Sequence, residues 1–326
     1  MVRLGLFCVI NDVFANYYDN TPLKQLFEKK SMHIVVTIDT EWDRVSGSAI
    51  NTNNLEQIPR FQRLCSSYNI KPVYFCSYEA IQNDRFVEYI TPFVNRKEVE
   101  IGAHLHPWSN PPYHTLDDQS KTFPHQYPID VFHQKMELLT KTILNRFNRA
   151  PISYRAGKFG FVNEHIEVLN KLGYKIDSSI TPFVPGPDID RGVNFEFYKQ
   201  LAPAVIGDSS FIVEIPITIL PTMSQRIFNR IIVDSLRRWF RIYPKTKLTD
   251  LNKIINFANG KIPVVVFMMH SNEFDHKYNP YFQDENSVDN MFLLLESFFK
   301  KLIELNITSV TFNDLLKTEV YESLLE

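Results

Sequence analysis

Short apolar runs that are rich in β-branched residues recur along this chain and are separated by segments with helical periodicity. The two clearest runs are 32–38 (M-H-I-V-V-T-I) and 262–269 (I-P-V-V-V-F-M-M). Continuous apolar runs of this length are typical of strands buried on both faces, as in a parallel sheet. Further strands are predicted around 99–101 and at 70–76, 151–154, 174–176, 211–217 and 307–312, and helices at 55–68, 84–94, 129–148, 163–172, 224–242 and 289–305.

This alternation of strands with helices predicts an α/β protein whose mostly parallel sheet is covered on both sides. A closed or nearly closed (β/α) barrel of about seven or eight strands fits the pattern. An open doubly wound sheet is the alternative, but no glycine-rich phosphate loop follows the first strand. The segment 109–128 has four prolines and no regular period, so it is predicted to be a long loop. The arginine-rich segment 224–242 is interpreted as a solvated outer helix rather than a helix on a membrane surface.

Composition excludes several classes of protein. The chain is 44% hydrophobic and 22% charged, which is typical of a soluble globular protein. A formal net charge of -2 argues against a general nucleic-acid binder, which would have a basic excess. The three cysteines, Cys8, Cys65 and Cys76, lie in apolar runs without a CxxC motif, which favours buried, reduced thiols in a cytosolic protein.

The N-terminal segment does not have the features of an export signal. The apolar stretch at 4–10 is stopped by Asn11 and Asp12, and no small-x-small cleavage site follows it. No window approaches the length of a membrane-spanning helix. We therefore expect an irregular extension at 1–30, one barrel domain at 31–326, and a cytoplasmic location. The oligomeric state is not predictable from the sequence.

Two histidines end the third predicted strand, in the segment 100–108 (E-I-G-A-H-L-H-P-W). In an extended chain, side chains two residues apart point the same way, so His104 and His106 can reach one ion. Neutral imidazole suits zinc, copper, iron and nickel. Gly102 and Ala103 before them leave room for close approach of backbone or ligand. Taken alone, the pair is equally well explained as two half-buried histidines at the end of a strand.

Polar side chains also follow other predicted strands. Asp39 ends the first strand, and His270 ends the most hydrophobic one; Arg155 and Asp177 follow two strands between them. In a (β/α) barrel the active site lies at the carboxyl ends of the strands. Each residue has a simpler explanation, such as a helix cap for Asp39. Because they gather at one end of the sheet, together they favour a metal-dependent hydrolase.

With these residues in view, the chain resembles the polysaccharide deacetylase superfamily, the carbohydrate esterases with a NodB-like domain, and most closely the branch called WalW-like. The resemblance covers about residues 32–315. It rests on five segments, namely T-I-D-T-E-W-D at 37–43, E-I-G-A-H-L-H-P-W at 100–108, Y-R-A-G-K-F-G at 154–160, I-D-S-S-I at 176–180 and F-M-M-H-S-N-E-F at 267–274. It implies a distorted (β/α) barrel that uses a divalent metal, zinc being preferred, to hydrolyse N-acetyl groups on amino sugars.

The resemblance also implies a role for each catalytic residue. Asp39 matches the general base that activates water, and Arg155 matches the arginine that orients this base. His270 matches the general acid that protonates the leaving amine, and Asp177 resembles the acid that supports this histidine. His104 matches the first metal-binding histidine.

Two departures from the family pattern affect the metal site. The second acid of the family's first motif falls at Thr40, so its role as a ligand passes to Glu41 or Asp43; Glu41 is favoured, because it lies two residues from Asp39 in an extended chain. The family's two histidines are spaced i, i+4, but position 108 is Trp, so the second ligand is His106. The expected metal ligands are Glu41, His104 and His106.

The predicted reaction is hydrolysis of a linear amide bond in an N-acetylated sugar, glycan or precursor. A metal polarises the carbonyl, a carboxylate takes a proton from water, and an imidazole protonates the amine. Trp42, Trp108 and Tyr113 are candidates for stacking on sugar rings. Two alternatives remain open: a glycan- or partner-binding domain without activity, and a metal hydrolase of the amidohydrolase type, against which the acids on the first strand count. The sequence names neither the sugar nor the metal.

Overall fold

The computed structural model describes residues 32–43, 50–115, 117, 121–186, 192–221, 226–227, 230–231 and 237–325. The predicted extension at 1–30 and Cys8 lie outside the described residues. Cys65 and Cys76 are buried free thiols, as predicted. Among the helices within the described ranges, none is long and apolar enough to cross a membrane.

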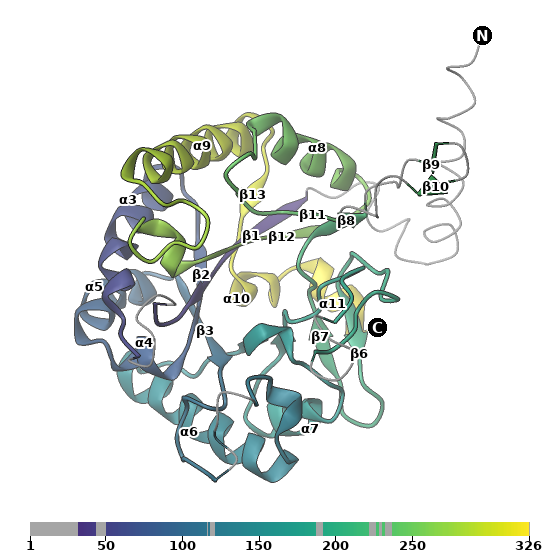
Figure 1. Ribbon diagram of the computed structural model, residues 1–326. Helices are drawn as coiled ribbons and strands as arrows, with labels where there is room; N and C mark the ends of the chain where they lie inside the picture. The colour runs from purple at the N-terminus through teal and green to yellow at the C-terminus, as the bar shows by residue number, and fades with distance from the viewer. Residues whose placement is uncertain are drawn as a thin grey trace.

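A mostly parallel sheet forms the centre of the molecule (Figure 1). Its strands pair in the order β12-β1-β2-β3-β4-β5-β7-β6, and β13 also pairs with β1. Only the β6–β7 pair within this sheet is antiparallel among the described pairings. The strands are β1 (His33–Thr40), β2 (Pro72–Cys76), β3 (Glu100–Leu105), β4 (Ser153–Ala156), β5 (Ile176–Asp177), β6 (Ala204–Ile206), β7 (Ile212–Glu214), β12 (Val264–His270) and β13 (Thr308–Ser309).

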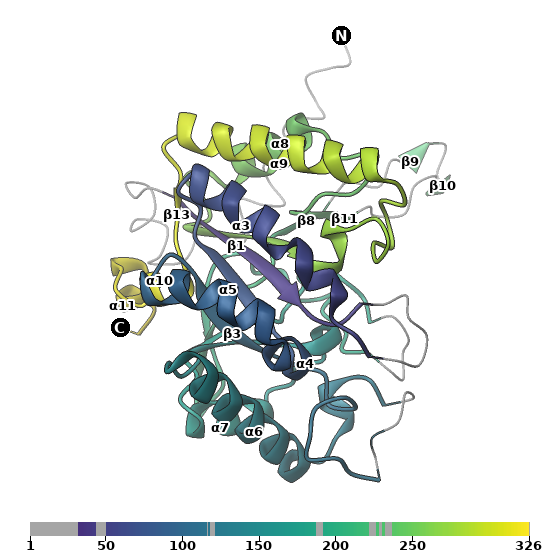
Figure 2. The ribbon, with the colours of Figure 1, turned by 90° about the vertical axis from the view of Figure 1, so that its left-hand side faces the viewer.

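Helices cover the outside of the curled sheet (Figures 1 and 2). They are α3 (Ile58–Ser67), α4 (Tyr78–Gln82), α5 (Asp84–Asn95), α6 (Ile129–Phe147), α7 (His165–Lys171), α8 (Leu248–Ala258) and α9 (Glu285–Glu304). The short helices α10 (Phe312–Leu315) and α11 (Glu319–Leu325) pack instead against the inside of the sheet. Short 3-10 helices are η1 (Asn53–Gln57), η2 (Pro124–Gln126), η3 (Gly157–Phe159) and η4 (Ser271–Phe274). The distorted (β/α) barrel predicted from the sequence is therefore confirmed.

The two faces of each strand pack into different cores because successive side chains alternate. On β1, Ile34, Val36 and Ile38 belong to the larger core between sheet and helices. Val35 belongs to a second cluster inside the curled sheet, with side chains such as Val73, Phe75, Val264 and Val266. Phe312, Leu315 and Val320 complete this inner cluster, so α10 and α11 pack at the end opposite the carboxyl ends of the strands.

The segment after β7 bridges the sheet toward β12. The backbone N–H of Thr218 donates to the Val266 carbonyl at 3.3 Å, and the Val266 N–H donates to Oγ1 of Thr218 at 2.9 Å. Next to this bridge, β8 (Ile219–Pro221) pairs with β11 (Arg237–Trp239) in an antiparallel sheet.

The helix predicted at 224–242 is wrong for the part of it that the structure describes. The residues 226–227 (β9) and 230–231 (β10) pair as antiparallel strands, and 237–239 form β11. The N–H of Met268 on β12 donates to the carbonyl of Phe240 at 3.1 Å, so pairing with the sheet replaces the helical bonds expected from the apolar spacing.

Candidate metal centre and active site

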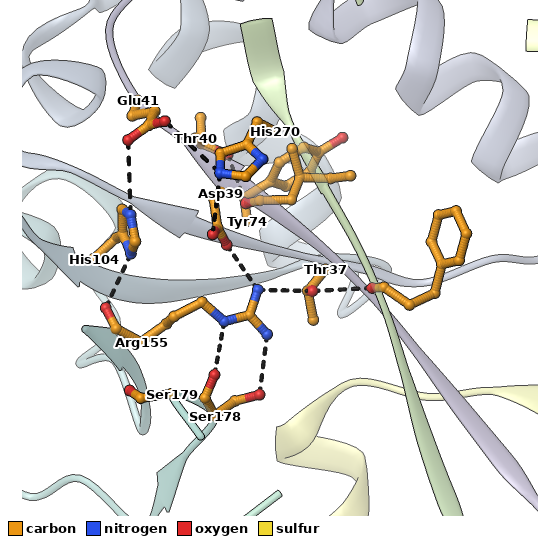
Figure 3. Close-up of polar contacts among 12 residues, drawn as sticks. Thr37, Asp39, Thr40, Glu41, Tyr74, His104, Arg155, Ser178, Ser179 and His270 are labelled. Carbon is orange, nitrogen blue, oxygen red and sulfur yellow. Dashed lines mark hydrogen bonds and ion pairs between the residues drawn. The ribbon is translucent and has the colours of Figure 1, made fainter. Parts of the chain in front are cut away.

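The inner face of the sheet brings most of the expected site residues together at the carboxyl ends of the strands (Figure 3). On β1, Asp39 follows Val35 and Thr37 at a spacing of two, so it points toward the barrel interior. His104, near the end of β3, pairs in register with Arg155 on β4, and His270 pairs in register with Asp39. Asp39, His104 and Arg155 are buried, and the His270 side chain is 12% exposed.

Glu41, His104 and His106 form a buried group whose ligand atoms converge. Oε2 of Glu41 lies 2.8 Å from Nε2 of His106 and 3.8 Å from Nε2 of His104, and the two Nε2 atoms are 3.0 Å apart. In a tetrahedral zinc site with bonds of about 2.0–2.2 Å, two ligand atoms lie about 3.3–3.6 Å apart. The observed separations bracket this range, so the three side chains fit a single divalent ion.

The surroundings of His104 prepare it for metal binding. Its Nδ1 lies 2.9 Å from the Arg155 carbonyl oxygen, which can only accept, so Nδ1 carries the proton and Nε2 keeps its lone pair. Burial, together with His106 and Arg155, lowers the pKa of His104 to about 4, although Asp39 and Glu41 act in the opposite direction. The imidazole is therefore neutral near pH 7, which is the form that binds a metal.

Gly157 makes room for the second histidine. A Cβ at this position would lie 2.8 Å from Nδ1 of His106 and 2.4 Å from the carbonyl oxygen of Leu105. Both distances are shorter than a carbon can tolerate without movement of its neighbours. The glycine after β4 thus sets the position of the His106 ring.

Strand alternation favours Glu41 over its neighbour as the acidic ligand. Thr40 points to the other face of β1, where its Oγ1 donates to the Ile38 carbonyl at 3.0 Å. The backbone of Glu41 is held in place, because its N–H donates to Oγ of Ser271 at 3.2 Å and its carbonyl accepts from Nδ2 of Asn54 at 2.9 Å. Asp43, the other candidate, is buried but is not a member of the converging group.

Asp39 is bound by the guanidinium of Arg155. Nη1 of Arg155 donates to Oδ1 of Asp39 at 2.7 Å and to Oγ1 of Thr37 at 2.9 Å. Nε and Nη2 donate to the carbonyl and the hydroxyl of Ser178 at 2.8 and 3.0 Å. Burial, the largest single influence, raises the pKa of Asp39, but Arg155, His104 and His270 together outweigh it and the pKa is below its ordinary value. Asp39 is therefore a carboxylate at neutral pH.

A glycine on β3 supports the position of Arg155. The guanidinium carbon lies 4.4 Å from the centre of the Phe75 ring. A Cβ at Gly102 would lie 2.6 Å from this ring, so only glycine allows Phe75 to occupy its place beneath the arginine. The sequence analysis linked Gly102 to a close approach of backbone or ligand. In the structure Gly102 leaves room for the Phe75 side chain instead.

His270 lies among three carboxylates, those of Glu273, Asp39 and Glu41. Its Nδ1 is 3.1 Å from Oε1 of Glu273, and its Nε2 is 3.7 Å from Oδ2 of Asp39 and 3.9 Å from Oε1 of Glu41. Glu273 is itself paired with the buried Arg241. The Arg241 guanidinium packs against aromatic rings, 4.7 Å from the centre of the Tyr243 ring.

The sequence analysis missed Glu273, which contacts His270, and Arg241, which pairs with Glu273; the role of Asp177 as the support of His270 stays a prediction. Asp177, the residue assigned to that position, is next to Ile176, whose side chain faces the inner cluster. Asp177 therefore points to the outer face of β5, where its Oδ1 accepts from Oγ of Ser179 at 2.6 Å. The spacing of His270 and Glu273, three residues apart across a helical turn, is the signal that indicates this pair.

Aromatic side chains flank the two histidines of the converging group. The Trp42 ring makes edge contacts with His106, at 4.6 Å between ring centres, and with Trp108, at 5.2 Å. Both tryptophans are partly buried, and the Tyr113 side chain is 70% exposed. Trp42 therefore packs against the converging group, and stacking on a sugar ring stays a prediction for all three.

Comparisons with known proteins find similar structures. No family model and no curated protein matches the sequence. A protein provisionally described as a polysaccharide deacetylase, from Mycobacterium smegmatis, has a TM-score of 0.56 at 13% identity, covering 90% of this chain and 92% of that one. An allantoinase has a TM-score of 0.51 at 11% identity, with 90% of each chain covered. A 4-alpha-glucanotransferase from Thermococcus litoralis has a TM-score of 0.56 at 12% identity, but 89% of this chain covers only 41% of that protein.

These similarities establish the fold. The chain has the NodB-like (β/α) barrel fold of the polysaccharide deacetylases, as the resemblance of the sequence segments implied. At identities of 11–13% the fold is shared by proteins named for different activities. The fold alone therefore does not determine which of these activities, if any, this chain has. The WalW-like assignment stays a prediction.

Proposed function

We propose that this protein is a metal-dependent hydrolase that removes N-acetyl groups from an amino-sugar-containing glycan or precursor. The observation that carries the proposal is the buried Glu41–His104–His106 group, beside a carboxylate held by arginine and an imidazole held by glutamate. A general base, a general acid and a set of metal ligands on one inner face are the groups that amide hydrolysis needs.

Glu41, His104 and His106 would hold the divalent ion, with zinc as the preferred metal because two imidazoles and one carboxylate are a common catalytic zinc set. When bound, the ion supplies Lewis-acid activation of a substrate carbonyl and lowers the pKa of a water molecule. The neutral state and fixed tautomer of His104 favour binding before any substrate arrives.

Asp39 is suited to the role of general base. Arg155 binds its Oδ1 and keeps the group ionised, while Oδ2 lies on the side of His270 and the metal ligands. A carboxylate in this position can take a proton from water during attack on the carbonyl. Arg155 fixes the orientation of the base and does not itself need to exchange a proton.

His270 is suited to the role of general acid for the departing nitrogen. Because Nδ1 donates to Glu273, Nε2 faces Asp39 and the metal ligands, and Nε2 is the atom that would carry the transferable proton in the protonated ring. The amine of an amide leaves poorly unless it is protonated, and a histidine is the side chain that most often performs such transfer near neutral pH. Base and acid thus lie beside the same group of ligands.

The direct test is acetate release from a panel of N-acetylated amino sugars and short glycans by the zinc-loaded protein, with and without a chelator. We expect release from at least one member of the panel, and its loss on chelation. A protein that binds zinc but releases no acetate from any of them would be a binding domain with a retained fold, and the proposed function would be wrong.

A further inference from the structure

Two acids on neighbouring strands lie on the face of the sheet opposite the proposed active site. Asp177 on β5 pairs in register with Glu214 on β7, so the two side chains lie side by side. Val213 and Ile215, on either side of Glu214, belong to the inner cluster, which places Glu214 on the outer face with Asp177. Both acids are fully buried, and the mechanism described above uses neither.

A hydrogen bond joins the two carboxyl groups. Such a bond needs a proton, because an ionised carboxylate can only accept. Burial and, after it, the charge of Asp177 raise the pKa of Glu214 well above its ordinary value. Burial also raises the pKa of Asp177, but the hydrogen bonds from Glu214 and Ser179 act in the opposite direction. Glu214 is therefore the acid that keeps the proton, and Asp177 accepts it.

The ionisable groups around the pair do not replace this proton. Arg155 acts on both acids from the inner face, where its guanidinium is bonded to Asp39. On the outer face, the phenol of Tyr154 lies in register with Asp177, and the phenol of Tyr198 is close enough for both acids to raise its pKa. Both hydroxyls are buried and have no hydrogen-bond partner within the described residues, so neither donates to the pair.

The two acids hold the backbone of the segment 178–180. The hydroxyl of Ser179 donates to Oδ1 of Asp177 at 2.6 Å, and its N–H donates to Oδ2 at 3.3 Å. The N–H of Ile180 donates to Oε1 of Glu214 at 3.0 Å. Each acid thus binds one of the two residues that follow Ser178, and the bond between the acids connects these two anchors.

Ser178 links this segment to the proposed active site (Figure 3). Its carbonyl and hydroxyl accept from Nε and Nη2 of Arg155 at 2.8 and 3.0 Å. Its hydroxyl in turn donates at 2.8 Å to the carbonyl of Ile215, the residue after Glu214. Because Arg155 also donates to Asp39, a continuous set of contacts runs from the buried acids to the proposed base.

We propose that Asp177 and Glu214 share one proton at neutral pH and, through Ser178, hold Arg155 in position against Asp39. The inference rests on the proposed function for the role of Asp39, and adds to it the residues that keep the partner of this base in place. Loss of the proton would leave two like charges in contact and break the bond between the anchors. Since the folded protein binds this proton, the support is present at low and neutral pH and is lost as the pH rises through the raised pKa of Glu214.

Infrared difference spectra of the full-length protein without substrate test the shared proton. At neutral pH, the spectrum of the wild type minus that of Glu214→Gln should contain the carbonyl band of a protonated carboxylic acid, because the amide keeps a hydrogen bond to Asp177 without an acid proton. Glu167→Gln is the matched control, at an exposed glutamate on α7 that is paired with Lys171. Its difference spectrum should contain carboxylate bands alone. A Glu214→Gln difference without an acid band overturns the proposal.

Hydrogen exchange at Nε of Arg155 tests the positioning role, by NMR with isotope-labelled arginine and with Arg155→Lys to identify the signal. Glu214→Met removes the shared proton and keeps a side chain of similar size. We expect exchange at this atom to become about tenfold faster, on the scale of one lost hydrogen bond. Glu214→Gln should restore slow exchange. Equal exchange rates in the wild type and Glu214→Met overturn the proposal.

The pH profile gives a second measurement that does not depend on the folding of Glu214→Met. As the pH rises, exchange at Nε of Arg155 should accelerate more in the wild type than in Glu214→Gln, whose amide does not titrate. Parallel profiles for these two proteins overturn the proposal. Neither measurement uses acetate release, so a failure here is distinguishable from a failure of the proposed function.

Discussion

Nδ1 of His270 lies 3.1 Å from Oε1 of Glu273, and this contact decides which ring nitrogen faces the metal ligands. Arg241 holds Glu273 from the other side, as Arg155 holds Asp39. The proposed acid and the proposed base are thus each oriented by a buried charged partner. Each of these contacts can be removed separately.

The first prediction concerns Glu273. In Glu273→Gln, the imidazole loses the carboxylate that fixes its tautomer, and Arg241 loses its counter-ion. We expect kcat for acetate release to fall by about 10²-fold, within the range for general acid–base catalysis, with zinc content unchanged. Asp177→Asn is the comparison, because Asp177 points to the outer face of the sheet. A larger loss in Asp177→Asn than in Glu273→Gln would restore the pairing inferred from the sequence.

The second prediction concerns the metal ligands. The double variant His104→Ala/His106→Ala should lose bound zinc, measured by elemental analysis after dialysis. His276→Ala, at a partly exposed histidine outside the converging group, should retain it. Glu41→Gln should weaken zinc binding at least tenfold, about 1.4 kcal/mol, and Asp43→Asn should not. Full occupancy in the double variant would show that the ion binds elsewhere.

The third prediction separates a catalytic His270 from a structural one. His270→Asn removes the transferable proton and keeps much of the side-chain volume. We expect kcat on an amide substrate to fall by about 10²–10⁴-fold, and activity on an activated ester, whose leaving group needs little protonation, to fall far less. Equal losses on both substrates with a lower melting temperature would indicate a structural histidine.

The fourth prediction concerns stability and pH. Burial raises the pKa of Glu100 to about 7, although Ser153 and the backbone N–H of Asn313 donate to it. The folded state therefore binds this proton more tightly than the unfolded state, whose pKa is about 4.5. The stability that the proton contributes is complete below pH 4.5 and is lost as pH rises to about 7.

The rise in the pKa of Glu100 from 4.5 to about 7 corresponds to a change of about 3 kcal/mol in the free energy of unfolding, as an order of magnitude. In Glu100→Gln this titration is absent. The free energy of unfolding of the variant, relative to that of the wild type, should therefore rise as pH increases from 4.5 to 7. Urea titrations across this range check the prediction, and parallel pH profiles for the two proteins would contradict it.

Much of the fold was predictable because its strands are continuous apolar runs. Runs such as 32–38 and 262–269 can only be buried on both faces, and the polar residues that end them then meet at one edge of the sheet. The family resemblance left Glu41 and Asp43 as candidates for the acidic ligand, and strand alternation favoured Glu41. Glu41 is the acid that lies within the converging group.

Other features could not be predicted because they depend on tertiary contacts. Which face Asp177 occupies depends on the register of the two-residue strand β5, and such a short segment has no visible period. Arg241 was overlooked because its neighbours have helical spacing, whereas pairing of β11 with β8 determines the local structure. Sequence periodicity is a weak guide to the structure of a short segment when its hydrogen bonds are made with neighbouring strands.

The most direct test of the proposed mechanism is acetate release by wild-type protein and Asp39→Asn at equal zinc content. The asparagine of this variant would keep the hydrogen bond from Arg155 through its carbonyl oxygen but could not accept a proton from water. We expect the two proteins to bind zinc equally and the rate of acetate release to fall by at least 10²-fold in the variant. Equal rates in the two proteins would contradict the assignment of Asp39 as the general base and, with it, the mechanism.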